Sequence, residues 1–249
     1  MSIPHQLWRS PAGDMTLDND EVHVWSACLD QPVARVRRLA ELCSPEERAR
    51  AERFRFQQDQ ERFLVRRGIL RTILSRYGAG APREQQFTRT LNGKPAVEPL
   101  PDQPPIQFNT SHSHALFLCA VARNARVGVD VEYMRPMPDA ERVAARFFAP
   151  GEFAAWRGLS NQDRVEGFYV CWTRKEAYIK ATGEGLARPL DSFEVSLRPG
   201  ESARLLHDAH DPENVSRYGL YDLRPAAGYI GALAVECSHY SIKCRQWAE

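Results

Sequence analysis

Two acidic residues, Asp130 and Glu132, lie two positions apart in the short apolar stretch Gly-Val-Asp-Val-Glu at 128–132. In a β-strand alternate side chains point to opposite faces, so both carboxylates project from one face while the valines point into a core. Two carboxylates at this spacing repel each other unless a cation, a basic side chain or water intervenes. A hard ion such as Mg²⁺ suits their oxygen atoms. The alternative is an exposed strand face with two solvated acids.

A second set of candidates lies in a stretch with helical spacing, from Trp172 to Gly183. One side of such a helix carries Glu176 and Lys180, one turn apart. Glu176 is a candidate third metal ligand or general base, and Lys180 is a candidate contact for phosphate oxygens. The simpler interpretation is a surface ion pair between these two side chains, which contributes roughly a few tenths of a kcal/mol to stability.

Polar side chains also gather from Asn109 to His114, directly after a predicted strand. Hydroxyls, an amide and two imidazoles at the junction of a strand and a loop suit a pocket for an anion or a nucleotide. Ser–His hydrolase chemistry is not indicated, because adjacent residues of a strand point in opposite directions and no acidic partner is evident.

Eight arginines lie between positions 48 and 71, and Lys94 follows in a Gly-Lys-Pro turn. Guanidinium groups suit phosphate because their planar fork donates two parallel hydrogen bonds. We expect most of these arginines to be solvated and paired with nearby glutamates, and two or three to face a ligand.

The elements that must position these residues alternate between strands and helices. Strands are predicted at 22–28, 106–109, 115–122, 127–133, 193–197, 218–223 and 229–236. Helices are predicted at 33–42, 59–77, 139–156 and 163–182. A capping box at Ser44 predicts the start of a further helix. Each half of the chain therefore carries strands and a long helix. This order predicts an α+β fold with two similar subdomains, 1–123 and 124–249.

Composition excludes several classes of protein. The 249 residues include 33 Lys and Arg against 32 Asp and Glu, so a net charge of +1 gives no global attraction to nucleic acid or to a membrane surface. No apolar run reaches the roughly 20 residues that span a bilayer, and residues 1–10 lack the apolar stretch of a secretion signal. The six cysteines form no CxxC pair, which indicates free thiols in a reducing cytoplasm.

Taken together, the acidic stretch at 128–132 and the segment Trp172-Thr-Arg-Lys-Glu176-Ala-Tyr-Ile-Lys180-Ala-Thr-Gly183-Glu-Gly185 resemble the signature of the 4′-phosphopantetheinyl transferases. The other matching motifs are Ser44-Pro-Glu, Arg53-Phe54, Asp59 with Arg62, Gly93-Lys94-Pro95, Phe108-Asn109-Thr-Ser111-His112-Ser113 and Phe147-Phe148. They run in family order from about Ser44 to Leu197 and are similar to the long, monomeric Sfp type.

The resemblance implies an enzyme that moves the phosphopantetheine arm of coenzyme A onto a serine of an acyl or peptidyl carrier protein and releases adenosine 3′,5′-bisphosphate. It also implies two pseudo-symmetric α+β halves with the active site in the cleft between them. The half at 1–123 would hold the nucleotide and its 3′-phosphate. The half at 124–249 would carry the magnesium ligands and the carrier-docking surface, for which a set of basic and aromatic residues is a candidate. That set is Arg142, Arg146, Phe147, Phe148 and Phe153, of which the aromatics suit the core equally well.

Residue roles follow from the same motif match. Asp130, Glu132 and Glu176 would be the Mg²⁺ ligands, and Lys180 would contact the cofactor phosphates. The positions that match nucleotide contacts are Arg50, Arg62, Lys94, Ser111 and His112. Glu47 departs from the pattern, because some relatives have a basic residue there.

The chemistry of these residues agrees with the implied reaction. A cation held by three carboxylates would neutralise a pyrophosphate, and Lys180 would add fixed positive charge where negative charge develops. Glu176 is the candidate base for the serine proton, directly or through a metal-bound water. Two alternatives stay open: a magnesium-dependent phosphodiesterase or nuclease, and a non-catalytic module that binds coenzyme A.

Overall fold

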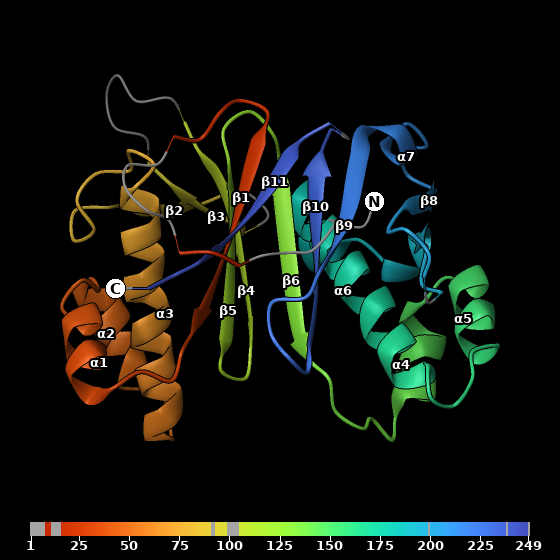
Figure 1. Cartoon of the computed structure of the whole chain (residues 1–249), viewed down its shortest axis with the longest axis horizontal. Coiled ribbons are helices and arrows are strands. Elements are labelled where there is room, and N and C mark those ends of the chain that lie inside the picture. The colour runs from red at the N-terminus through yellow and green to blue at the C-terminus, as the bar shows by residue number, and fades with distance from the viewer. Residues whose placement is uncertain are drawn as a thin grey trace.

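Two mixed helix-and-strand halves lie side by side in the computed structural model, which describes residues 8–10, 16–90, 93–98, 105–198, 200–237 and 239–248 (Figure 1). Each half contains a β-sheet and a long helix on its outer side. The predicted α+β class is confirmed. The two longest helices, one in each half, correspond to the stretches whose helical spacing was strongest in the sequence.

The first half is built on a four-stranded sheet with the order β11-β1-β5-β4. Its strands are β1 (Glu21–Cys28), β4 (Gln107–Ser113), β5 (Leu116–Ala122) and β11 (Ser241–Gln246), beside a hairpin of β2 (Phe87–Arg89) and β3 (Pro95–Val97). Its helices are α1 (Val33–Ala40), α2 (Pro45–Ala51) and α3 (Gln57–Ser75). α2 begins with the predicted capping box, in which Ser44 and Glu47 bond each other's backbone N–H groups at 3.2 and 3.0 Å.

The second half is built on an antiparallel sheet with the order β6-β10-β9. Its strands are β6 (Val127–Tyr133), β9 (Tyr218–Leu223) and β10 (Tyr229–Glu236), beside a pair formed by β7 (Phe193–Val195) and β8 (Leu205–Asp208). Its α-helices are α4 (Ala140–Phe147), α5 (Pro150–Arg157), α6 (Arg164–Thr182) and α7 (Asn214–Arg217), with short 3₁₀ turns η1 (Gly185–Ala187) and η2 (Leu190–Ser192).

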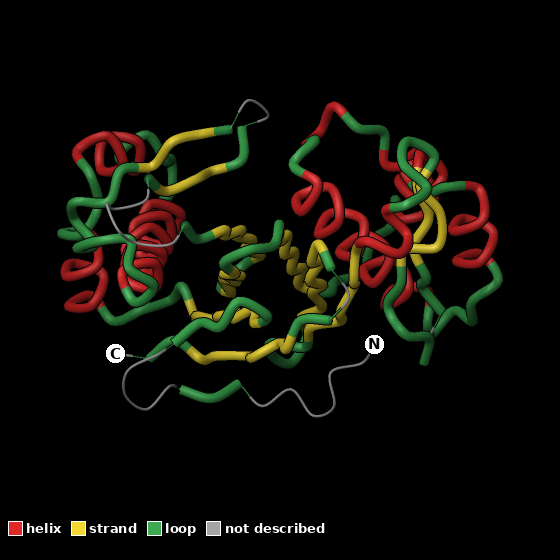
Figure 2. The backbone as a smooth tube through the Cα atoms, turned by 90° about the horizontal axis from the view of Figure 1, so that it is seen from above, coloured by secondary structure: helices red, strands yellow, loops and turns green. Residues whose placement is uncertain are grey.

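Three apolar clusters hold these layers together. One packs α3 against the first sheet, a second packs α6 against β9 and β10, and the third lies between the two sheets. The order from one side to the other is therefore helix, sheet, sheet, helix, and Figure 2 shows the helices on the two flanks with the strands between them. Burial of both faces of the central strands explains why β5 is apolar at every position.

Several elements differ from the sequence prediction. The single helix predicted at 139–156 is wrong, because Phe148 is extended before Pro150, which starts a second helix. The strand predicted to end at Asn109 continues to Ser113. The short strands β2, β3, β8 and β11 were not predicted, and β11 pairs in parallel with β1. The C-terminal strand thus belongs to the sheet of the first half, which the boundary at 123/124 did not include.

A buried polar cluster links β1 to the end of α3. His23 is fully buried, with Nδ1 2.8 Å from Tyr77 Oη and Nε2 3.2 Å from Glu21 Oε2. Trp25 Nε1 donates to the same tyrosine oxygen at 2.7 Å. Burial of the imidazole, assisted by the charge of Arg245, lowers the pKa of His23 from 6.5 to about 4.

We expect His23 to make the fold sensitive to mild acid. The unfolded chain binds a proton as the pH falls below 6.5, whereas the folded chain resists until about pH 4. The contribution to stability is therefore complete above pH 6.5 and is lost as the pH falls toward 4, by about 2 kcal/mol between pH 7 and pH 5. Urea unfolding of wild type and His23→Gln at both pH values measures it. An equal pH dependence of the two proteins contradicts the assignment.

Candidate functional site

The two halves meet where β4 runs beside β6, and side chains link these strands at alternate positions. Asn109 Oδ1 accepts a hydrogen bond from the backbone N–H of Val129 at 3.0 Å. One pair further along, Ser111 Oγ donates to Asp130 Oδ1 at 2.8 Å. The prediction that this polar cluster follows a strand is wrong, because it lies within β4. Its residues face the acidic strand of the other half.

Ser113 extends this series to the second acid of β6. Its hydroxyl accepts a hydrogen bond from the Tyr133 backbone N–H at 3.1 Å and lies 2.8 Å from Glu132 Oε2. Because the hydroxyl oxygen already accepts the Tyr133 backbone N–H, its own proton is directed at the Glu132 carboxylate. Sequence reasoning did not select Ser113 as a site residue. Its position two residues after Ser111, on the same strand face, was the available signal.

The acidic strand has the predicted two faces. Val127, Val129 and Val131 are fully buried between the sheets, and Asp130 and Glu132 point to the opposite side. Asp130 is only 4% exposed, so the alternative of an exposed face with two solvated acids is wrong for this residue.

A glycine allows the long helix of the second half to approach this strand. A Cβ atom on Gly128 would lie 2.1 Å from the carbonyl oxygen of Ala177 and 2.4 Å from the backbone nitrogen of Ala181. Any side chain at position 128 would push α6 away from β6. The close contact places Lys180 beside Asp130.

Lys180 bonds to the strand rather than to its neighbour on the helix. Its Nζ donates to Asp130 Oδ1 at 2.6 Å and lies 3.3 Å from the Val129 carbonyl and 3.4 Å from Ser111 Oγ. The ammonium group therefore touches both halves of the chain, through β4 and β6. No ion pair between Glu176 and Lys180 occurs among the described side chains, so the simple surface pair predicted as the alternative is wrong.

The three acids share one electrostatic environment. Burial, reinforced by the neighbouring charge of Asp130, raises the pKa of Glu132 above its usual value. The same two causes raise the pKa of Glu176, which lies in the field of both strand carboxylates. Glu132 and Glu176 are therefore harder to ionise beside the other negative charges, and a cation would relieve this repulsion.

The donor chemistry of this cluster fits a hard divalent cation. Asp130 Oδ2 is buried and has no hydrogen-bond partner in the described part of the chain. Three carboxylates supply the oxygen ligands that such ions prefer. Within the described residues no three acidic, histidine or cysteine side chains are already gathered in a metal-binding arrangement. Lys180 instead holds the other oxygen of Asp130.

A basic cavity of about 990 Å³ opens between α2, α3 and the β2–β3 hairpin. Seven arginines line it: Arg48, Arg50, Arg66, Arg67, Arg71, Arg83 and Arg89. Glu47 also lines it and accepts hydrogen bonds from Arg67 and, at 3.0 Å, from Arg71. The charge of Glu47, the residue that departs from the expected family pattern, is therefore compensated by two arginines of α3.

The residues expected to contact a nucleotide have different surroundings. Arg50 lines the basic cavity, whereas Arg62 and His112 line an adjacent cavity of about 330 Å³. Arg62 also forms a two-point ion pair with Asp30, at 2.7 and 2.9 Å. Lys94 lines neither cavity, and its Nζ donates to the Val127 carbonyl at 2.9 Å.

Two of these residues have strongly lowered pKa values. Burial and the charge of Arg126 lower the pKa of Lys94 to about 8. His112 keeps part of its surface in solvent, but partial burial of its ring and the charges of Arg66 and Lys180 lower its pKa to about 4. The imidazole is therefore neutral near pH 7 and lies in a positive environment that favours an anion.

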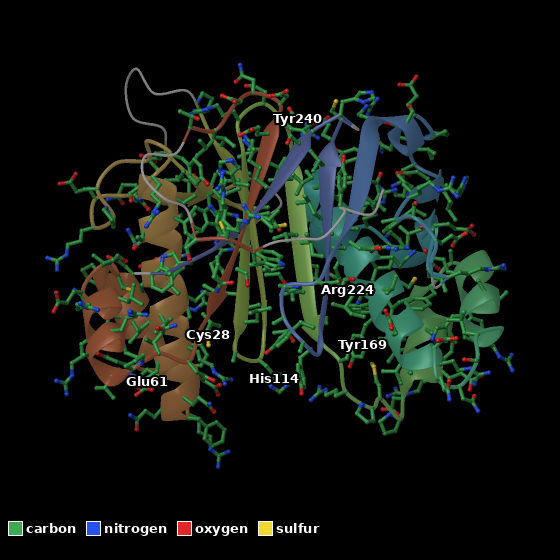
Figure 3. All side chains as sticks on the ribbon, in the orientation of Figure 1. Cys28, Glu61, His114, Tyr169, Arg224 and Tyr240 are labelled. Carbon is green, nitrogen blue, oxygen red and sulfur yellow. The ribbon has the colours of Figure 1, made fainter. Side chains whose placement is uncertain are left out.

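A third pocket, of about 240 Å³, begins at Glu132 and Ser113 and continues over Met137, Phe168 and Trp172. It offers an apolar surface next to the acids. Figure 3 shows two further lining residues, His114 and Tyr169, at the same end of the molecule. Phe148 is 3% exposed and stacks on Phe168. The prediction that it lies on a docking surface is therefore wrong, and the alternative prediction, that it lies in the core, is confirmed.

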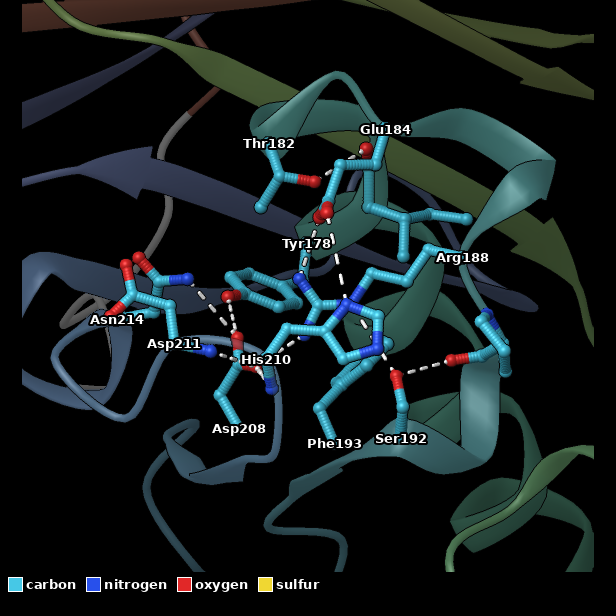
Figure 4. Close-up of polar contacts among 12 residues, drawn as sticks. Tyr178, Thr182, Glu184, Arg188, Ser192, Phe193, Asp208, His210, Asp211 and Asn214 are labelled. Carbon is cyan, nitrogen blue, oxygen red and sulfur yellow. Dashed lines mark hydrogen bonds and ion pairs between the residues drawn. The ribbon is translucent and has the colours of Figure 1, made fainter.

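The helix that carries Lys180 is anchored at its C-terminal end by a buried network (Figure 4). Asp208 is fully buried and accepts hydrogen bonds from Tyr178, Arg188 and Asn214. Although burial opposes it, the hydrogen bonds led by that of Tyr178 lower the pKa of Asp208 to about 2. Arg188 also pairs with Glu184 at 2.6 Å. The turn that follows Lys180 is thereby fixed to β8.

The other lysine of the helical motif is structural. Lys175 is fully buried, and its Nζ donates to Glu152 at 2.6 and 2.8 Å and to the Phe193 carbonyl at 2.6 Å. Glu152 also accepts the backbone N–H groups of Ala149 and Val195. This pair connects α5, α6 and β7 behind the site and does not reach the acids.

Both parts of the chain match families of known proteins. Residues 25–124 match the family described as 4′-phosphopantetheinyl transferase, N-terminal, and residues 126–234 match the 4′-phosphopantetheinyl transferase superfamily. The 4′-phosphopantetheinyl transferase HetI of Nostoc sp. is 39% identical over 228 residues, which cover 92% of this chain and 93% of HetI. The 4′-phosphopantetheinyl transferase Sfp of Bacillus subtilis is 31% identical over 198 residues, covering 78% and 86%.

Among solved structures, the holo-[acyl-carrier-protein] synthase of Thermotoga maritima gives a TM-score of 0.36 at 24% identity, covering 45% of this chain and 62% of that one. Across the described residues, no helix has the length and apolar character that a membrane span requires.

Proposed function

Because the chain belongs to the 4′-phosphopantetheinyl transferase superfamily, we propose that it transfers the phosphopantetheine arm of coenzyme A to a serine of an acyl or peptidyl carrier protein. Adenosine 3′,5′-bisphosphate is the second product. The main support for the proposal is that Ser111 and Lys180 both donate hydrogen bonds to Asp130 at the junction of two halves, each of which matches this family. We place the monomeric enzyme in the cytoplasm, where its free cysteines stay reduced.

Asp130, Glu132 and Glu176 are the residues that would hold Mg²⁺ in this proposal. When bound, the ion supplies positive charge to the pyrophosphate of coenzyme A and to the leaving bisphosphate. Support comes from the unpartnered, buried Oδ2 of Asp130, and from the burial and neighbouring negative charge that raise the pKa of the other two acids.

Lys180 and Glu176 act on the reacting groups. The serine oxygen forms a bond to the β-phosphorus, and the bond from that phosphorus to the bridging oxygen breaks with its electron pair leaving on the bisphosphate. Lys180 places a fixed positive charge beside the phosphates. Glu176 receives the serine proton as the general base.

Two surfaces next to the acids suit the remaining parts of the reaction. The pocket over Met137, Phe168 and Trp172 suits the uncharged pantetheine arm. Arg142 and Arg146 of α4 are exposed and remain our candidates for docking an acidic face of the carrier.

Mass spectrometry of a carrier tests the proposal directly. Purified protein is incubated with coenzyme A, Mg²⁺ and a panel of apo carriers from fatty-acid, polyketide and peptide synthesis. We expect at least one carrier to gain the mass of one phosphopantetheine arm, and only with coenzyme A present. Binding of coenzyme A with no carrier modified supports the non-catalytic module instead. Cleavage of a phosphodiester or nucleic-acid substrate under the same conditions supports the nuclease alternative.

Ser113 is expected to hold Glu132 in its working position. Ser113→Ala removes the hydrogen bond to the carboxylate, and because such second contacts to metal ligands typically change affinity by roughly 10- to 100-fold, we expect weaker metal binding of that order. Ser113→Thr keeps the hydroxyl and retains most of the affinity. Titration with Mn²⁺, followed by its electron spin resonance signal, measures this without turnover. Equal affinities of wild type and Ser113→Ala contradict the role.

A further inference from the structure

His114 is the first of two residues that turn β4 into β5, and its backbone has a conformation that glycine normally supplies. Ser113 pairs with Leu116, so His114 and Ala115 alone form the turn. The φ angle of His114 is +48°, and two-residue hairpin turns favour glycine where φ is positive. A side chain in this region is strained, and such residues gather at functional sites. The strain therefore raises the question of what the imidazole does.

The side chain of His114 lies on the border between two cavities. It lines the cavity of about 330 Å³ that includes Arg62 and His112, and it also lines the pocket of about 240 Å³ that begins at Glu132. No other residue in the described ranges lines both. The residue is exposed, and Figure 3 shows it at the lower end of the sheets, between the two halves. A ligand that occupied both cavities would pass it.

A row of aromatic rings holds the imidazole in place. The centre of its ring lies 4.8 Å from that of Tyr133, which in turn lies 5.0 Å from that of Tyr229. Gly228 leaves room for this row, because a Cβ atom there would lie 3.0 Å from Tyr133 Cε2. The imidazole nitrogens form no hydrogen bond or ion pair with any side chain that the structure describes. They are therefore open to a partner from outside the chain.

We propose that His114 binds the pantetheine arm of coenzyme A where the arm passes from the first of these cavities to the second. This inference rests on the proposed function. The nucleotide would lie on the side of Arg62 and His112, and the uncharged arm would continue into the apolar pocket beyond Glu132. The arm carries amide groups, and an imidazole N–H donates a hydrogen bond to an amide carbonyl. The strained turn is retained for substrate binding rather than for the fold.

Isothermal titration calorimetry with two ligands tests the proposal. Wild type, His114→Gly, His114→Asn and His207→Asn are each titrated with coenzyme A and with adenosine 3′,5′-bisphosphate, which lacks the arm. Glycine adopts positive φ without strain and asparagine tolerates it well, so both variants keep the hairpin. His207→Asn is the matched control, because it removes an exposed imidazole of β8 that lines neither cavity. Thermal unfolding of each variant is measured alongside.

We expect His114→Gly to weaken coenzyme A binding by about 3- to 10-fold and bisphosphate binding by less than about 2-fold, as for the loss of one hydrogen bond to the arm. His114→Asn has a shorter side chain and gives a similar loss, and His207→Asn changes neither affinity. Because strain is relieved, His114→Gly should unfold at the wild-type temperature or above it.

Equal weakening of both ligands by His114→Gly, or no weakening, overturns the proposal. A lower unfolding temperature with an unchanged affinity for coenzyme A assigns His114 to the fold and overturns it as well. Failure of the wild type to bind either ligand counts instead against the proposed function.

Discussion

We expect Asp130→Asn and Glu176→Gln each to lower the rate of phosphopantetheine transfer by about 100- to 1000-fold. Each replacement keeps the shape of the side chain and removes one negative charge from the group that would hold Mg²⁺. The fold of Glu176→Gln should survive, because Glu176 has a raised pKa and its ionised form is less favourable folded than unfolded. Neutralising it therefore leaves stability unchanged or increases it, as is common for acids retained for function.

The control for this experiment lies on the same helix. Glu166 is in the first turn of α6, about half exposed, and pairs with Arg224 at 2.7 Å. Glu166→Gln removes an acid of the same kind far from Asp130 and should leave transfer unchanged. Initial rates with a saturating carrier, together with thermal unfolding midpoints, separate lost chemistry from lost folding. Near-normal turnover in Asp130→Asn or Glu176→Gln, with Mg²⁺ still required, refutes the ligand assignment.

Lys175→Met is expected to destabilise the protein by about 3–5 kcal/mol. The replacement leaves Glu152, which is 1% exposed, as a buried carboxylate without its cation. Urea unfolding measures the loss. In Glu152→Gln combined with Lys175→Met the uncompensated charge is removed and the amide oxygen still accepts a backbone N–H, so we expect part of the stability to return.

Activity distinguishes this structural lysine from the one in the site. Transfer per folded molecule should stay near normal in Lys175→Met, because Lys175 bonds to Glu152 and to the Phe193 carbonyl and to none of the site residues. Lys180→Met should instead lose activity while remaining folded. A stable but inactive Lys175→Met would assign that residue to the chemistry and contradict our account.

These two lysines show what the sequence can and cannot reveal. Positions 175 and 180 are five residues apart, which places them about 140° apart around a helix, so they face different directions. Helical spacing alone does not say which direction leads to the core. Lys175 has its partner 23 positions away, on α5. Only tertiary structure separates the buried ion pair from the site cation.

Prediction succeeded where the signal was local. Alternation of valine with acidic residues determined the two faces of β6, and apolar spacing located the helices α3 and α6. It failed where partners are distant. β11 forms its ladder with β1, some two hundred residues earlier, and the side chains of Ser111 and Ser113 bond to acids of another strand, β6. Likewise, the pairing of Glu47 with Arg67 and Arg71 joins α2 to α3 across about 20 residues of sequence.

Anomalous X-ray scattering from Mn²⁺ tests most directly whether the two strand acids and the helix acid act as one ligand set. Crystals grown with coenzyme A and Mn²⁺ in place of Mg²⁺ should show one manganese peak at the junction of β6 and α6. We predict carboxylate oxygens of Asp130, Glu132 and Glu176 at about 2.1 Å from it, with Lys180 moved from Asp130 to a phosphate oxygen. A peak that lacks Glu176 as a ligand, or no peak at this junction, would contradict the account.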